Sequence, residues 1–149
     1  MSEQPFDIKN LVKQAGREVA PAPRWEKPPF EEEVGEVDRT ADELGLDKEL
    51  LRAAYQAGQL EQLSDEDWAV MENCDSRDRE WTSAEVAGHL AATRDYATIE
   101  AGFKSGNRMY TPVVLFRPGQ PPYLVAGNSR LLGCRALGIA PTILAMRFQ

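Results

Sequence analysis

The clearest hydrophobic pattern lies in the last third of the chain, where three short runs are rich in β-branched and apolar residues. We predict strands at Thr111–Phe116, Tyr123–Ala126 and Thr142–Phe148, the first two joined by a turn that contains glycine and proline. Between the second and third runs, apolar residues predict a helix that opens at Gly127 and ends at Gly138. This order of strand, helix and strand predicts a βαβ crossover, with the last strand parallel to Tyr123–Ala126.

Helical patterns dominate the chain before these strands. Asp47 is suited to cap a helix that Gly58 would stop, and Ser64 and Thr82, each followed three residues later by an acid, predict the starts of two more helices. We therefore expect an α+β fold in which helices pack around a small mixed sheet.

The first part of the chain is predicted to be an arm. Its first 20 residues carry a helical apolar stripe, and the stretch from Pro21 to Glu43 is proline-rich and then acidic. We interpret residues 1–43 as an arm and solvated linker that contribute little to the core, and residues 44–149 as the domain. The arm has apolar residues spaced to bind a partner, and a second copy of the chain is the simplest one: Phe6, Ile8, Leu11, Val12, Trp25 and Phe30.

Composition supports a single acidic domain. The chain has 149 residues and a net charge of −7, but residues 101–149 hold 6 Lys/Arg and no acid, whereas residues 1–100 hold 24 Asp/Glu. This basic segment either attracts phosphate or docks against the acidic part of the same chain, and we favour docking. A sequence pI near 4.8 argues against non-specific nucleic-acid binding.

Further function classes are excluded by what the sequence lacks. The two cysteines, Cys74 and Cys134, have no second Cys or His at metal-ligand spacing, which argues against a zinc site and a disulfide framework. The N-terminal sequence has no signal-peptide pattern, and no apolar run reaches the length of a membrane span. We expect a cytoplasmic protein with no membrane partner.

The turn at residues 127–130 is the best candidate for chemistry. Gly127 permits a sharp strand-to-helix turn, and the free N–H groups of the helix, with the positive end of its dipole, form an anion site. Arg130 adds a cation that can bind phosphate bidentately, Ser129 a hydroxyl and Asn128 an amide. Ordinary helix capping explains the same residue types, so the turn alone is a weak signal.

The C-terminal sequence resembles the ParB N-terminal and sulfiredoxin superfamily, in which a strand runs into a Gly-x-x-Arg turn and a helix. The resemblance covers residues 65–148. It is most similar to small phage and bacterial ParB-like proteins that read Val-Ala-Gly-Asn-Thr-Arg-Leu at this turn, and it includes Glu72-Asn-Cys-Asp-Ser76 and Arg94-Asp-Tyr96. Asn128 and Ser129 stand where ParB clamps have Glu and Arg and where sulfiredoxins have the catalytic Cys and a His. Sulfinic acid reduction is therefore excluded, and nucleotide hydrolysis does not follow from the resemblance.

The turn and the resemblance together predict a nucleotide- or phosphate-binding protein, and NTPase or phosphotransfer activity at the turn would further require a carboxylate. The expected ligand is a nucleoside triphosphate with Mg²⁺, and no site for a metal is assigned. The expected phosphate-binding residues are Gly127, Asn128, Ser129 and Arg130, with Arg94 or Arg108 as a second clamp. The expected catalytic carboxylate is Asp75, or secondly Asp95, because the basic segment has none.

Two alternatives remain beside this interpretation. Asp75 and Ser76 are typical caps for the helix that follows them. The whole protein is alternatively a non-catalytic accessory protein of phage or plasmid type, which keeps the fold and binds a protein partner through its acidic arm. Sequence-specific DNA binding is not expected, because there is no room after the last strand for a helix-turn-helix.

Overall fold

The computed structural model describes residues 23–76, 101–103 and 108–149. Several predictions fall on other residues and lie outside the described ones: the helix of the first 20 residues with its proposed dimer contact, the helix after Thr82, Arg94 and Asp95. None of the described helices is long and apolar enough to cross a membrane.

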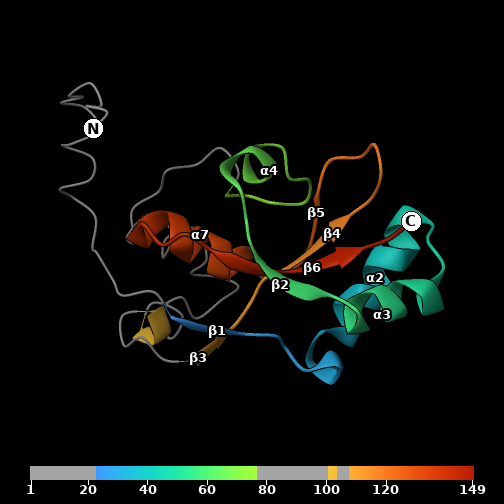
Figure 1. Ribbon diagram of the computed structural model, residues 1–149, viewed down its shortest axis with the longest axis horizontal. Coiled ribbons are helices and arrows are strands. Elements are labelled where there is room, and N and C mark those ends of the chain that lie inside the picture. Colours follow the sequence, from blue (N-terminus) through green and yellow to red (C-terminus); the bar gives the residue numbers. More distant parts are fainter. Residues whose placement is uncertain (1–22, 77–100, 104–107) are drawn as a thin grey trace.

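The described residues form a mixed α+β fold (Figure 1). Its helices are α2 (Phe30–Leu44), α3 (Lys48–Gln56), α4 (Asp65–Ala69) and α7 (Asn128–Leu137). Its strands are β1 (Arg24–Glu26), β2 (Gln59–Gln62), β3 (Arg108–Tyr110), β4 (Val113–Phe116), β5 (Tyr123–Ala126) and β6 (Thr142–Arg147). A four-stranded sheet has the order β2-β6-β4-β5, and β1 pairs with β3 in a separate parallel ribbon.

Strands β4, β5 and β6 are buried on both faces, which explains why their positions are apolar except for Thr142 and Arg147 at the two ends of β6. Along β4, Val113 and Leu115 join a core with α2 and α3, while Val114 joins the core with α4 and α7. The same alternation continues in β6, where Leu144 faces the first core and Ile143 the second. Figure 1 shows the resulting arrangement, with α7 and the α2–α3 pair on different sides of the strands.

The predicted crossover is wrong in its pairing. β4 and β5 form the antiparallel hairpin, but β6 is parallel to β4 and not to β5. Ala126 at the end of β5 and Leu144 near the start of β6 both align with Val113, so β6 starts at the end of the sheet where β5 stops. α7 therefore connects two antiparallel strands, and the parallel pair that we predicted for β5 and β6 is formed by β4 and β6.

The solvated linker predicted before Leu44 is also wrong where the structure describes it. Residues 30–44 form α2, with Val37, Thr40 and Ala41 buried. Phe30 packs edge-to-face on Tyr55 of α3. Arg52 of α3 donates to both carboxylate oxygens of Asp38 in α2 at 2.8 and 2.6 Å. This helix belongs to the core because its apolar residues lie on one face, although its overall composition is acidic.

The predicted caps agree with the structure. The Asp47 side chain accepts from the Leu50 N–H at the start of α3, and the Ser64 side chain accepts from the Asp67 N–H at the start of α4. Gly138 ends α7 in the left-handed conformation, at φ 68°. Strand β2 was not predicted, because its sequence Gln-Leu-Glu-Gln is polar and it lies at the edge of the sheet.

Candidate functional site

A polar cavity of about 510 Å³ lies where β5 ends and α7 begins. Three parts of the chain form its walls: α2, the segment 73–75, and residues 124–128 with Arg130. Its charged lining residues are Glu32, Glu33, Glu36, Asp75, Arg39 and Arg130. The cavity therefore includes the predicted turn, but it also includes a helix that the sequence pattern did not connect with it.

Gly127 makes the turn possible for two reasons. Its φ is +103°, which residues with a side chain rarely adopt. A Cβ at this position would also lie 2.6 Å from Pro112 Cα, so a side chain has no room. The close approach to Pro112 lets α7 start directly after β5, with its first N–H groups at the cavity.

Two hydrogen bonds join Asn128 and Asp75, which both line the cavity. The Asp75 N–H donates to Asn128 Oδ1 at 3.0 Å, and Asn128 Nδ2 donates to Asp75 Oδ2 at 3.1 Å. The structure therefore brings Asp75 to the turn, as the functional alternative for this residue requires. The helix that Asp75 was alternatively expected to cap lies outside the described residues.

The residues just before Asp75 are attached to β5, the edge strand of the sheet. Glu72 forms an isolated parallel bridge with Tyr123 of β5. The side chain of Asn73, whose backbone is left-handed at φ 59°, donates to the Leu124 carbonyl at 2.8 Å. Ser76 is fully buried, and its hydroxyl accepts from Trp68 Nε1 at 2.8 Å. These contacts position Asp75 from both sides.

Arg130 is held by the chain itself. Its Nη1 donates to the carbonyl oxygens of Tyr110 and Thr111 at 2.8 and 3.1 Å, and its Nη2 lies 3.8 Å from Glu33 Oε1. Only 19% of the Arg130 side chain and 11% of the Glu33 side chain are exposed. Burial raises the pKa of Glu33 above its usual value, and the charge of Arg130 opposes that shift. Arg130 thus has a structural role as well as a place in the cavity.

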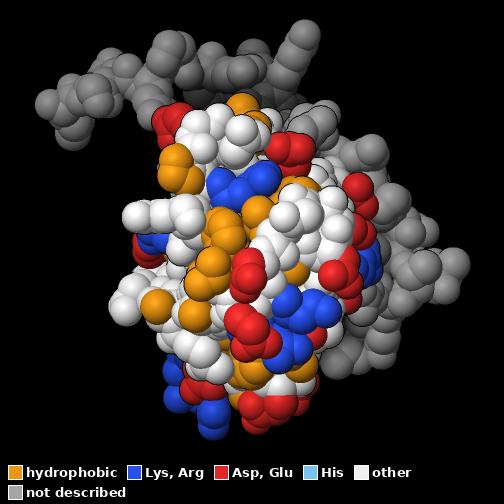
Figure 2. Space-filling model, turned by 90° about the vertical axis from the view of Figure 1, so that its right-hand side faces the viewer, with side chains coloured by type: hydrophobic (Ala, Val, Ile, Leu, Met, Phe, Trp, Pro, Cys, Tyr) orange, Lys and Arg blue, Asp and Glu red, His pale blue; other side chains and the backbone are white. Residues whose placement is uncertain are grey.

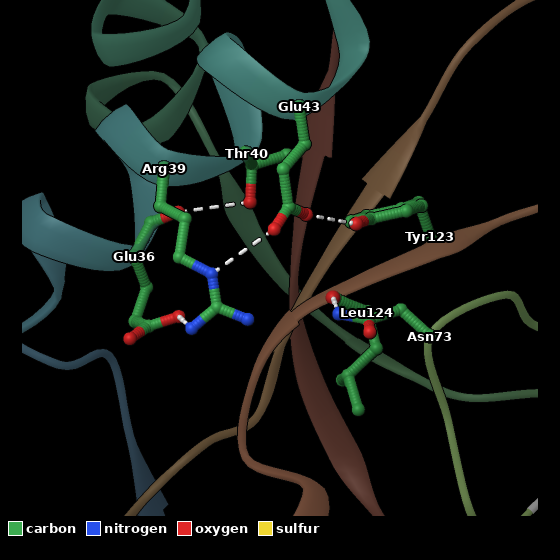
Figure 3. Close-up of polar contacts among 7 residues, drawn as sticks. All are labelled: Glu36, Arg39, Thr40, Glu43, Asn73, Tyr123 and Leu124. Atoms are coloured by element: carbon green, nitrogen blue, oxygen red, sulfur yellow. Dashed lines mark hydrogen bonds and ion pairs between the residues drawn. The ribbon is translucent and has the colours of Figure 1, made fainter.

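Figure 3 shows the α2 wall of the cavity, which the sequence did not indicate. Arg39 lies between two acids of its own helix, with an ion pair to Glu36 at 3.6 Å and a hydrogen bond from Nε to Glu43 Oε1 at 3.2 Å. The Tyr123 hydroxyl donates to the other oxygen of Glu43 at 2.7 Å. These hydrogen bonds, from Tyr123 first and then from Arg39, hold the pKa of Glu43 below its usual value. The network ties α2 to β5 and holds Arg39 at the cavity.

Two of the expected site residues do not line this cavity. Arg108 is paired with Glu26 at 2.8 Å in the β1–β3 ribbon and does not line this cavity. Ser129, in the first turn of α7, also lies outside the lining. Cys134 is buried in the core, and burial raises the pKa of its thiol.

The expected docking of the basic segment on the acidic part of the chain is confirmed for three arginines. Arg108, Arg130 and Arg147 pair with Glu26, Glu33 and Glu61, respectively. Three of the six positive charges of this segment are therefore paired with acids of the preceding part of the chain.

The cavity lining contains groups that favour an anion and also four carboxylates that accept hydrogen bonds. The N-terminus of α7 and the two arginines favour an anionic group, while the four carboxylates accept hydrogen bonds from hydroxyl or amino groups. Among the described residues, no group of three or more His, Cys, Asp and Glu side chains is placed to hold a metal ion. The donor set therefore does not form a protein cage for Mg²⁺, and Asp75 is the acid nearest the turn.

No protein-family model matches the chain, and no curated protein or solved structure matches it significantly.

Proposed function

We propose that the cavity binds a small phosphate-bearing ligand, with a nucleotide as the first candidate. The observation that carries this proposal is that the N-terminus of α7 opens into a polar cavity of about 510 Å³ that also contains Arg39 and Arg130. This volume is within the range of about 300–1,000 Å³ that is usual for small-molecule sites. The resemblance to ParB-like proteins points to the same turn, but that assignment requires the last strand to run parallel to β5, and β6 pairs with β4 instead. The proposal therefore rests on the cavity and not on the resemblance.

In the proposed complex, a phosphate lies at the first N–H groups of α7, beside Arg130. Arg39 is the second clamp, in place of Arg94 or Arg108. The carboxylates of α2 and Asp75 accept from hydroxyl or amino groups on the rest of the ligand. A nucleotide carries both kinds of group, whereas free phosphate carries only the first. We propose binding alone, without a chemical step. If the ligand brings Mg²⁺ with its phosphates, Asp75 is the residue placed to contact it.

The test is calorimetric titration with ATP, CTP, GTP and inorganic phosphate, each with and without Mg²⁺. Arg39→Gln is the informative variant, because Arg39 is exposed and its partners Glu36 and Glu43 are exposed as well. We expect it to weaken binding by about tenfold or more, since a hydrogen bond to a charged group contributes on the order of 1.5–3 kcal/mol. Arg130→Ala is less informative, because it removes two bonds to backbone carbonyls and leaves Glu33 without its cation.

Arg24→Gln is the matched control, because Arg24 is an exposed arginine on β1, outside the cavity. Binding by the wild type and the control, together with weak binding by Arg39→Gln, supports the proposal. The absence of binding of every nucleotide at millimolar concentration refutes it.

The second candidate is a non-catalytic accessory protein that binds a protein partner. The internal pairing of Arg108, Arg130 and Arg147 favours it, because these side chains already have acidic partners. The same titration separates the two proposals: a chain that folds normally but binds no nucleotide or phosphate supports the accessory role.

A further inference from the structure

A second cavity lies at the opposite end of the sheet, where β4 and β6 stop. These two strands are parallel, and Phe116 at the end of β4 is aligned with Arg147 at the end of β6. The cavity has a volume of about 250 Å³ and is lined by Phe116, Arg117, Pro118, Arg147, Phe148 and Gln149. The carboxyl ends of neighbouring parallel strands are a common place for ligands in α/β sheets.

Arg117 is the unusual residue of this cavity. Its Nε is buried, and within the part of the chain that the structure describes no acceptor forms a hydrogen bond with it. No described carboxylate lies within ion-pair distance of its guanidinium group either. A buried donor without an acceptor is unfavourable, so a group that accepts a hydrogen bond from Arg117 would stabilise it. Arg117 therefore gains from an oxyanion that these residues do not supply.

Arg147, the other arginine of the cavity, has a different environment. Both of its Nη groups donate to Glu61, one of them at 2.9 Å, and its guanidinium lies 5.2 Å from the Phe116 ring centre. Hydrogen bonds from Arg147 lower the pKa of Glu61, which stays ionised near neutral pH. Because Glu61 balances the charge of Arg147, the unbalanced positive charge of the cavity is that of Arg117. No Asp or Glu side chain is among the described residues that line it.

The cavity also has an apolar wall. Phe116 and Phe148 are both half-buried and lie in the lining together with Pro118. Figure 2 shows the end of the molecule where α2, α3 and the end of β6 lie, and Lys and Arg side chains there adjoin hydrophobic ones. A volume of about 250 Å³ is below the usual range for drug-sized ligands, so a ligand of about one ring fits.

We propose that Arg117 binds the oxyanion of a small organic anion, a carboxylate or a phosphate ester, whose apolar part packs against Phe116 and Phe148. Arg117 can bind either oxyanion through two parallel N–H groups. The site is separate from the cavity at the start of α7, since it is formed by the opposite ends of the strands.

Amide NMR titration of the full chain tests the proposal, because it locates the binding site. The probes are benzoate, phenyl phosphate, inorganic phosphate and the uncharged benzyl alcohol. We expect benzoate or phenyl phosphate to shift the amides of residues 115–118 and 146–149. Inorganic phosphate, which lacks the apolar part, is expected to bind more weakly, and benzyl alcohol, which lacks the anion, should not bind. Arg117→Gln should weaken binding about tenfold or more, while Arg24→Gln should leave it unchanged.

Each outcome decides the proposal. A response to only one of the two aryl anions identifies the oxyanion and supports the site. Equal binding to the wild type and to Arg117→Gln overturns it, as does the absence of any response at residues 115–118. Loss of binding through Arg39→Gln, with Arg117→Gln unaffected, would place the anion in the first cavity and overturn the second site alone. The melting temperature of each variant shows that the fold is intact.

Discussion

Gly127→Ala tests the turn on which the first cavity depends. The change adds one methyl group at a position with φ +103°, where the new Cβ would lie 2.6 Å from Pro112 Cα and 2.7 Å from Pro112 Cβ. Pro112 directly precedes β4, so its backbone cannot move without moving the strand. The variant therefore changes the entry into both β4 and α7.

Two contributions add to the cost. Holding a non-glycine residue in a sparsely populated conformation costs on the order of 1–3 kcal/mol. Relieving an overlap in a well-packed region costs about 1–3 kcal/mol more. The expected loss is therefore about 2–6 kcal/mol in the free energy of unfolding, against a total stability of roughly 5–15 kcal/mol for a typical domain. We expect a folded protein with a clearly lower stability.

Two other glycines are matched controls. Gly138 has φ +68° with no atom within 4 Å of an added Cβ, so Gly138→Ala measures the backbone strain without the overlap. Gly35 lies exposed inside α2 with nothing within 4 Å, and Gly35→Ala should raise the stability by about 0.5–1 kcal/mol because alanine favours the helix.

Urea unfolding followed by far-ultraviolet circular dichroism measures all three variants. The expected order of stability is Gly35→Ala, wild type, Gly138→Ala and Gly127→Ala. If Gly127→Ala loses no more stability than Gly138→Ala, the close approach to Pro112 does not constrain the turn, and our account of how α7 is placed is incorrect.

Three further changes test the packing around the sheet. Tyr123→Phe removes the hydrogen bond to Glu43 and should lower the free energy of unfolding by about 0.5–1.5 kcal/mol near neutral pH. Because the pKa of Glu43 is lowered in the folded chain, the difference in stability between wild type and variant should shrink in unfolding measurements as the pH falls below the usual value of 4.5. Glu33→Gln should raise the stability near pH 7, because the pKa of Glu33 is raised and its ionised form disfavours folding; the advantage should vanish in melts well below pH 4.5, where Glu33 is protonated in both states. Leu144→Ala should lower the free energy of unfolding in urea by about 2–5 kcal/mol, since Leu144 is fully buried. Leu60 lies opposite Leu144 on strand β2 and is 41% exposed, so Leu60→Ala should cost much less.

The strands and caps of the C-terminal region could be predicted because their signals are local. β4, β5 and β6 are buried on both faces, so their positions are apolar except at the two ends of β6, and Gly127 and Gly138 delimit α7. The pairing of β6 could not be predicted in the same way. A helix between two strands has the same sequence pattern whether the second strand starts at the end of the sheet where the first strand stops or at the opposite end. Here β6 starts where β5 ends, and it therefore runs parallel to β4.

The error at α2 has a different cause. Phe30, Val34, Val37, Ala41 and Leu44 recur at helical spacing, so the signal for an amphipathic helix was present. The composition of this segment is acidic and it follows two prolines, which is typical of a linker. The average composition of an amphipathic helix does not show that its apolar residues lie on one face, so an acidic helix is mistaken for a linker.

The same error concealed half of the site. The functional alternative for Asp75 put it near the turn, and the structure places it there, in hydrogen bonds with Asn128. Arg39, Glu33 and Glu36 were not expected, because they reach the cavity only when α2 packs against β5. Contacts of this kind depend on tertiary packing, and no spacing within the sequence indicates them.

The charges of the two cavities lead to opposite effects of Mg²⁺ on a phosphate ligand. The first cavity has four carboxylates and two arginines, so a bare phosphate meets excess negative charge, and Mg²⁺ bound to the phosphates should strengthen binding. In the second cavity the unbalanced charge is that of Arg117, with no described acidic side chain in the lining, so Mg²⁺ that pairs with the ligand should weaken binding. Titrations of ATP and of phenyl phosphate at matched ionic strength, with and without Mg²⁺, measure both effects. If Mg²⁺ changes the affinity of both ligands in the same direction, the local charges do not control binding, and the assignment of the two ligands to separate cavities is wrong.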